Sequence, residues 1–155
     1  MFEQRAAARR SVSRRIAGCD ADRLFSIIAD VERYPEFVPG CISMRIMQRR
    51  ERSWVVDNVF GIGPFRCQFR SAANLDPPLA LTINSRDGPW RFFSIEWRLR
   101  PEDRACHLSF VVVLEFRSPL LGALTNFAAT EFEQRVIAAF EARVRSLSKG
   151  ERRER

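Results

Sequence analysis

Apolar and polar residues alternate through most of the segment 41–117, which is the pattern of β-strands that bury one face. Short turn signals rich in Gly, Pro, Asp and Arg interrupt the alternation at regular intervals. They lie at 49–52, 61–64, 76–78, 87–89 and 101–104. The pattern predicts a meander of antiparallel strands.

The two faces of this predicted sheet differ in polarity. The apolar parity comprises Phe65, Cys67, Phe69, Ser71, Leu79, Leu81, Ile83, Phe93, Ile95, Trp97, Leu99, Cys106, Leu108, Phe110, Val112, Leu114 and Phe116. The opposite parity holds Arg66, Gln68, Arg70, Glu96, Arg98, His107, Ser109 and Glu115. Because one face is apolar, another layer of structure must cover it.

A strand and a helix are predicted before the meander. The strand spans about 11–16, and Asp20 can cap the helix that follows. Its apolar face consists of Leu24, Ile27, Ile28 and Val31. The helical pattern ends at Tyr34-Pro35, since a residue before proline avoids the helical region. Residues 34–40 then form an apolar corner.

A second helix is predicted after the meander. Ser118 provides its N-cap and Pro119 its first position, and the periodicity continues to about Leu147. Its apolar stripe comprises Phe132, Val136, Ala139, Phe140 and Leu147. The first turns, 120–124, are apolar almost all round, and Phe127 points away from the stripe. One helix is too narrow to cover six strands, so we expect an apolar cavity between helix and sheet.

These elements predict a single α+β domain over 11–148, with a basic arm at 1–10 and a basic tail at 149–155. The interior should be broad and dry, because the chain has 13 Phe and 3 Trp but only one Tyr. Of the net charge of +7, residues 1–15 contribute +4 and residues 149–155 contribute +2. Such termini suit attraction to an anionic membrane or RNA, or are simply solvated.

The sequence gives little support for a metal site or a catalytic site. Cysteines 19, 41, 67 and 106 form no CxxC pair, so we expect no metal site and a reducing compartment. His107, the single histidine, falls on the polar parity with no nucleophile at a matching position. Glu96 and Glu115 point outward too. The longest uncharged stretch, 118–130, is too short to span a membrane.

Four segments resemble a known family. They are DVERYPEFVPGC at 30–41, Asp87-Gly88-Pro89-Trp90 leading to Trp97, LEFRSPLL at 114–121 and AFEAR at 139–143. In this order they resemble the coenzyme-Q-binding, polyketide-cyclase-like branch of the START superfamily, across about 11–147. Trp90 departs from the pattern, where Phe is more usual.

The resemblance implies a helix-grip fold, in which a curved antiparallel sheet of six to seven strands wraps around a long C-terminal helix. It also implies binding of a hydrophobic lipid, ubiquinone or a precursor, as a carrier that supports quinone synthesis and respiration. Such a protein is not an enzyme and needs no covalent cofactor. It lies in the cytoplasm against the inner membrane, or on the matrix side in a mitochondrion, and binds no DNA. Bacterial relatives described as a toxin that blocks association of ribosomal subunits give the alternative, and a cyclase- or hydrolase-like enzyme is a third.

The candidate ligand-binding residues are those that these patterns direct into the cavity or to its rim. They are Phe37, Phe69, Ile83, Phe93, Trp97, Phe110, Leu121, Leu124, Phe132, Val136 and Arg143. Phe93 and Trp97 could stack on a quinone ring or simply form the core. Arg143 interrupts the apolar stripe of the last helix, so it either reaches the surface, pairs with a sheet carboxylate or donates to a ligand carbonyl. Leu120, Leu121, Leu124 and Phe127, with the corner at 37–39, are the expected membrane contact.

Overall fold

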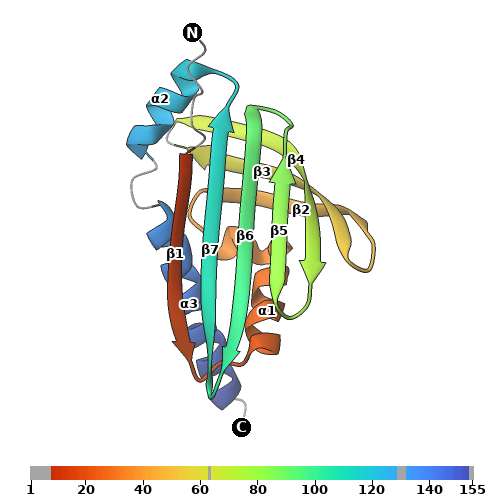
Figure 1. Cartoon of the computed structure of the whole chain (residues 1–155), viewed down its shortest axis with the longest axis vertical. Coiled ribbons are helices and arrows are strands. Elements are labelled where there is room, and N and C mark those ends of the chain that lie inside the picture. Colours follow the sequence, from red (N-terminus) through yellow and green to blue (C-terminus); the bar gives the residue numbers. More distant parts are fainter. Residues whose placement is uncertain (1–7, 63, 129–131, 154–155) are drawn as a thin grey trace.

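A computed structural model describes residues 8–62, 64–128 and 132–153 of the chain (Figure 1). Its strands are β1 (Ala8–Ala17), β2 (Cys41–Arg49), β3 (Ser53–Ile62), β4 (Phe65–Asp76), β5 (Ala80–Ser85), β6 (Trp90–Glu102) and β7 (Ala105–Phe116). Its helices are α1 (Ala21–Ala29), the 3-10 helix η1 (Val31–Glu36), α2 (Pro119–Ala128) and α3 (Phe132–Arg153).

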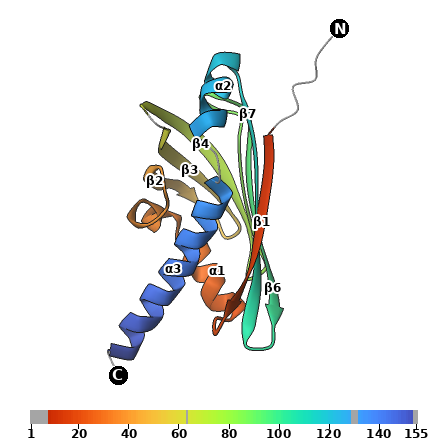
Figure 2. The ribbon, with the colours of Figure 1, turned by 90° about the vertical axis from the view of Figure 1, so that its left-hand side faces the viewer.

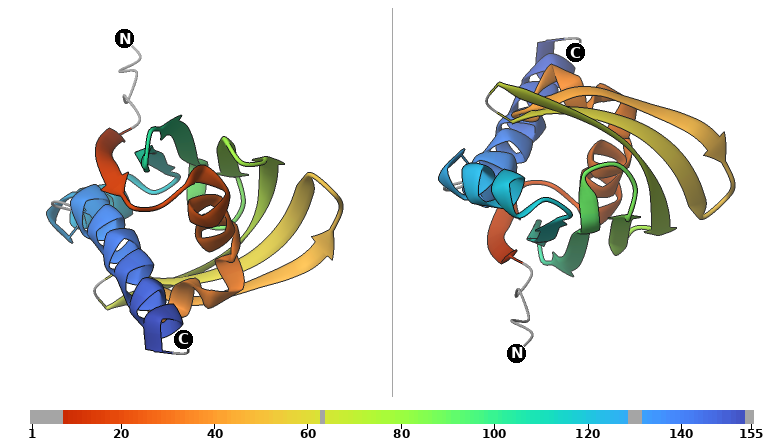
Figure 3. Two further views of the ribbon diagram at one scale, coloured as in Figure 1. Left: turned by 90° about the horizontal axis from the view of Figure 1, so that it is seen from below. Right: turned by 90° about the horizontal axis from the view of Figure 1, so that it is seen from above.

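All seven strands form one antiparallel sheet in the order β1-β7-β6-β5-β4-β3-β2. Strands β2 to β7 follow each other in sequence order, which confirms the predicted meander. β1 pairs with β7 from Ala8↔Leu114 to Ala17↔Ala105. The sheet curves so that α1 and α3 lie on its concave side (Figure 3). This arrangement confirms the expected helix-grip fold.

The predicted strand parity holds where the helices cover the sheet. Leu81, Trp97, Leu108 and Phe110 are buried on the concave side. Phe65 and Leu79 were predicted on the same face, but both are exposed. Phe65 begins β4 beside a hairpin, and Leu79 lies in the turn before β5. The buried part of the apolar face therefore ends before these two tips of the sheet.

The N-terminal helix forms as its sequence predicts. The Asp20 side chain accepts a hydrogen bond from the Arg23 amide at 2.8 Å, which caps α1. After α1 the chain tightens into η1, which includes Pro35. The Tyr34 hydroxyl donates to the carbonyl of Ile28, so η1 folds back onto the end of α1.

The prediction of one helix from Pro119 to Leu147 is wrong. The structure has two helices whose axes differ in direction (Figure 2). α2 lies at the end of β7, where Gly122 approaches Phe116, whereas α3 crosses the concave face. A straight helix could not do both. Leu147 was predicted to be buried but is exposed, because the C-terminal end of α3 extends past the sheet. The buried stripe of α3 is Val136, Ile137, Phe140 and Val144.

Arginines of β1 hold the strand and α3 together. The Arg10 and Glu133 side chains lie 3.7 Å apart, and the Arg14 and Glu141 side chains 3.4 Å apart. Arg14 also donates to the Gln134 side chain at 2.8 Å. β1 begins at Ala8 and α3 continues to Arg153, so parts of the arm and tail expected from the sequence belong to regular elements. Two of the basic residues near the N-terminus are therefore engaged within the fold.

Candidate functional site: an apolar cavity between the sheet and α3

The concave face of the sheet and α3 enclose an apolar cavity of about 30 Å³. The side chains that line it come from η1, the corner after η1, the strands β2, β3, β5, β6 and β7, and α3. They are Tyr34, Val38, Met44, Asn58, Phe60, Ile83, Phe93, Ile95, Trp97, Phe110, Phe132, Val136 and Phe140. A volume of this size holds about one water molecule. The cavity is therefore closed to any larger ligand until its walls move.

Trp97 occupies the centre of the wall. Its ring lies 4.5 Å from that of Phe110 and 4.6 Å from that of Phe140, measured between centroids. Phe140 continues the cluster to Tyr34 at 5.2 Å and to Phe37 at 4.9 Å, both edge to face. The aromatic cluster thus joins the sheet, α3 and η1.

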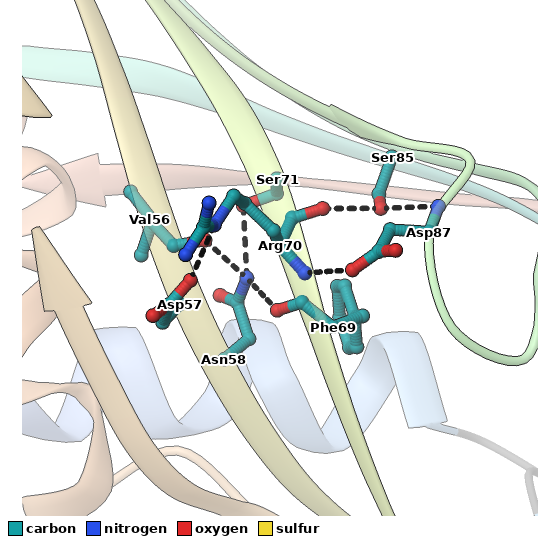
Figure 4. A network of polar contacts seen from close by, with 8 residues as sticks. All are labelled: Val56, Asp57, Asn58, Phe69, Arg70, Ser71, Ser85 and Asp87. Atoms are coloured by element: carbon teal, nitrogen blue, oxygen red, sulfur yellow. Dashed lines mark hydrogen bonds and ion pairs between the residues drawn. The ribbon is translucent and has the colours of Figure 1, made fainter. Parts of the chain in front are cut away.

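Asn58 is the polar exception among the lining residues. It is 2% exposed, and its amide nitrogen donates to the carbonyls of Val56 and Phe69, both at 3.1 Å, and to the Ser71 hydroxyl at 2.9 Å (Figure 4). These bonds fix the amide in the interior. Because buried polar groups are costly unless they are paired, such a residue in an apolar wall points to a specific role.

The same polar network continues to the edge of β4, where β5 stops pairing with it. The Arg70 amide donates to the Asp87 carboxylate at 2.8 Å, and the Ser85 hydroxyl donates to the Arg70 carbonyl at 2.6 Å (Figure 4). Pairing between β4 and β5 reaches only from Asp76↔Ala80 to Ala72↔Asn84. The side chains of Ser85, at the end of β5, and Asp87, in the turn after it, therefore replace backbone pairing at this point.

Six of the eleven predicted site residues line the cavity. They are Ile83, Phe93, Trp97, Phe110, Phe132 and Val136. Phe37 contacts the lining residue Phe140, and Phe69 contacts the lining residue Phe93, but neither Phe37 nor Phe69 lines the cavity itself. Leu121 is half-buried on α2 and does not line this cavity. The side chain of Leu124 lies outside the described part of the structure.

Arg143 pairs with a carboxylate rather than facing the cavity. Its guanidinium lies 2.7 Å from the Glu36 carboxylate and 5.0 Å above the ring of Phe37. Among the roles that the sequence left open, the structure shows an ion pair, with a partner on η1 instead of on the sheet. Arg143 fastens α3 to the corner that carries Phe37.

Sequence reasoning missed seven residues of the lining. They are Tyr34, Val38, Met44, Asn58, Phe60, Ile95 and Phe140. Ile95 and Phe140 were assigned to the correct faces but not to the site. For β3 a signal exists, since Trp54, Val56, Asn58 and Phe60 share one parity. Asn58 is a polar residue within that apolar series.

A scan against family models matches residues 18–141 to the family described as polyketide cyclase / dehydrase and lipid transport. The match covers most of the chain, including η1, every cavity-lining strand and the part of α3 that lines the cavity. The chain belongs to this family.

Members and structural neighbours of this family carry different roles. The chain is 25% identical over 128 residues to the ribosome association toxin RatA of Vibrio cholerae, covering 82% of this chain and 89% of RatA. It is 26% identical over 116 residues to the mitochondrial coenzyme Q-binding protein COQ10 of Drosophila melanogaster, covering 72% of this chain and 48% of that protein. A START superfamily protein from Mycobacterium smegmatis superposes with a TM-score of 0.74 at 18% identity, over 92% of this chain and 99% of that chain. The last likeness shows the START fold.

Cyclases and dehydrases of the family need reactive groups, so the titratable side chains near this cavity are informative. Burial raises the pKa of the Cys41 thiol to about 12 and raises the pKa of the Tyr34 hydroxyl well above its usual value. Burial also raises the pKa of Cys19, Cys67 and Cys106. These groups stay protonated at neutral pH, so they are poor nucleophiles or bases.

The single histidine lies away from the cavity. His107 is on the convex face of β7, paired in the sheet with Arg15 and Arg100. Among the described residues, no three His, Cys, Asp or Glu side chains lie close enough to hold a metal ion. In the same part of the chain, no helix is both long and apolar enough to cross a membrane.

Proposed function

We propose that this protein binds an isoprenoid quinone, coenzyme Q or a precursor, between the concave face of the sheet and α3, and carries it without chemical change. The observation that supports this most is the cavity itself, which is lined by aromatic and aliphatic side chains apart from Asn58. Small-molecule sites combine such apolar walls with a few placed polar groups. The likeness to a coenzyme Q-binding protein supports the class of ligand.

Binding requires the wall to open. A quinone ring is larger than a cavity of about 30 Å³, so α3 must shift from the sheet or its side chains must rotate. The polar contacts of α3 with β1 and η1 lie at its flanks, and one partner of each ion pair is exposed, so water can reach these pairs when α3 shifts. Such a hinged cover is a common way to admit a ligand to a closed site.

Quinone uptake is the direct test. Protein purified from cells that make ubiquinone is expected to release an isoprenoid quinone on solvent extraction, and the emptied protein should take up decylubiquinone saturably. Val136→Phe should weaken uptake, because the added ring would occupy the space between α3 and the sheet that the ligand must enter. Native mass spectrometry measures both.

The matched control is Val111→Phe, the same change on the convex face of β7, which should leave uptake unchanged. If extraction yields no isoprenoid lipid and uptake does not saturate, the proposal is wrong.

The start of α2 suits contact with a membrane surface, from which so insoluble a ligand must be drawn. Leu120 is 71% exposed there, close to the end of β7. An exposed leucine favours insertion among lipid chains, since each buried CH₂ contributes about 0.8 kcal/mol. The proposed location is thus peripheral, against the membrane that holds the quinone.

Leu120→Ser is expected to lower binding to anionic liposomes and to slow quinone transfer severalfold, with bound-quinone stoichiometry in detergent unchanged. Liposome flotation and a transfer assay measure this. Leu79→Ser is the control, because Leu79 is an exposed leucine in the β4–β5 turn, away from α2. Equal effects of both changes would contradict a membrane contact at α2.

Association with ribosomal subunits is the second candidate, favoured by the match to RatA over 89% of that toxin. Ion pairs on the surface of the sheet argue against ribosome binding. Arg70 lies 2.8 Å from Asp57, Arg91 lies 3.6 Å from Glu115, and Arg98 contacts Glu96. Acidic partners of this kind interrupt any broad surface for phosphates.

Sedimentation with purified subunits separates the two candidates. A protein held by 6–10 phosphates loses roughly 10³–10⁵ in affinity between about 50 and about 200 mM salt. We expect only weak sedimentation with subunits at the lower salt and none at the higher. Tight sedimentation at both, by protein without bound quinone, would place the ribosome first.

A further inference from the structure

The amide of Asn58 presents an unused acceptor at the cavity. Its nitrogen is occupied by Val56, Phe69 and Ser71, whereas no hydrogen bond among the described residues reaches its oxygen. Two backbone carbonyls accept from the nitrogen, which fixes which end of the amide is which. The oxygen therefore turns away from β4, on a residue that lines the cavity.

The indole of Trp90 presents an unused donor. Trp90 is 3% exposed, and its ring nitrogen has no hydrogen-bond partner among the described residues. A buried indole N–H usually finds an acceptor. Trp90 also stands where the resemblance described above predicts Phe, which has no N–H to satisfy.

Asn58 and Trp90 flank the same aromatic surface. Asn58 pairs with Phe69 across β3 and β4, and the Phe69 ring lies 5.5 Å from that of Trp90. Phe93, which lines the cavity, lies 5.1 Å from Phe69 and 5.0 Å from Trp90. Trp90 does not line the cavity itself, but its ring contacts Phe93, so a ring that displaces Phe93 would lie beside the Asn58 amide and against the Trp90 indole.

We infer that this end of the cavity selects an aromatic head group that carries both a hydroxyl, donated to the Asn58 oxygen, and a further oxygen that accepts from the Trp90 N–H. Methoxy-substituted hydroquinones have both groups, whereas the oxidised quinone has no donor for Asn58. The site therefore prefers the reduced ligand. This inference rests on the proposed quinone binding and specifies its head group and redox state.

The test compares three probes with equal tails: decylubiquinol, decylubiquinone and decylbenzene. Native protein is expected to bind decylubiquinol roughly three- to tenfold more tightly than decylubiquinone, the effect of about one hydrogen bond. Trp90→Phe should weaken both oxygenated probes by a similar factor and leave decylbenzene unchanged. Titration calorimetry under argon gives the dissociation constants, and the Trp90 indole N–H resonance, assigned by loss in Trp90→Phe, should move downfield with the oxygenated probes only.

Asn58→Leu combined with Ser71→Ala removes the amide together with its side-chain partner. This double change should abolish the preference for decylubiquinol over decylubiquinone. Ser71→Ala alone is the control, because it retains the amide oxygen and should retain the preference. If native protein binds quinones without preference, or if Trp90→Phe binds all three probes normally, the inference is wrong while quinone binding stands. If no probe binds, the proposed function itself fails.

Discussion

Trp97→Ala is expected to lower the free energy of unfolding by about 3–5 kcal/mol, the range for removal of a large aromatic side chain from a core. Trp97 is 1% exposed and contacts Phe110 and Phe140 within the aromatic cluster that joins sheet, α3 and η1. Chemical denaturation followed by circular dichroism measures the loss.

The same substitution should weaken decylubiquinone uptake, because α3 would lose its main contact with β6. Trp97→Phe provides the control, since it keeps an aromatic ring and should cost less than half as much stability. A Trp97→Ala protein with native stability and native uptake would show that the cluster does not hold the cavity wall.

The sequence could predict which face of the sheet each strand residue occupies, because successive side chains in a strand point to opposite faces. Once Phe93 and Trp97 share a face, the part of β6 from Phe93 onward follows, and the structure places both at the cavity. A register shift between Trp90 and Phe92 ends this parity near the start of β6, where Trp90 is buried as well. The turn signals of the meander lie at the ends of the observed strands or between them, because Gly, Pro and Asp favour turns. The exposure of apolar side chains at the ends of strands, such as Phe65, could not be predicted. It depends on how much of the concave face the helices cover.

The break between α2 and α3 illustrates the limit of periodicity. Both segments have helical patterns, so the sequence alone gives no reason to separate them. The direction of each helix is decided by tertiary contacts. Gly122 rests near Phe116 at the end of β7, whereas Phe140 packs on Trp97 in the middle of the sheet. Partners so far apart are not readable from local sequence.

Polar members of the site were harder to predict than apolar ones. Arg143 could have had several partners, and its carboxylate lies 107 positions away on Glu36. Asn58 was overlooked because strand β3 was not assigned faces residue by residue. An inward-facing amide in an apolar strand is a stronger signal for a ligand than any single aromatic residue, because an aromatic residue also suits an ordinary core.

Gly88→Ala is expected to cost about 3–4 kcal/mol of unfolding free energy, far more than most glycine substitutions in a turn. Gly88 has a φ of +62°, and a left-handed conformation costs an alanine about 1–2 kcal/mol. An added Cβ would also lie 2.8 Å from the carbonyl oxygen of Gln68 and 3.1 Å from the Cβ of Phe69. The turn must then move off β4, which disrupts the exposed bond from the Arg70 amide to Asp87 and the half-buried bond from the Ser85 hydroxyl to the Arg70 carbonyl. A typical hydrogen bond contributes about 0.5–1.5 kcal/mol.

Gly18→Ala is the matched control, because Gly18 has a φ of +70° but no atom of the described residues lies within 4 Å of an added Cβ. It should lose only the conformational cost of about 1–2 kcal/mol. Gly88→Ala should in addition displace Phe69, which contacts both Trp90 and Phe93, and so weaken quinone uptake. Thermal unfolding and uptake assays on the two variants separate backbone strain from the lost contact. Equal losses in both would mean that the β5–β6 turn does not support the wall of the cavity.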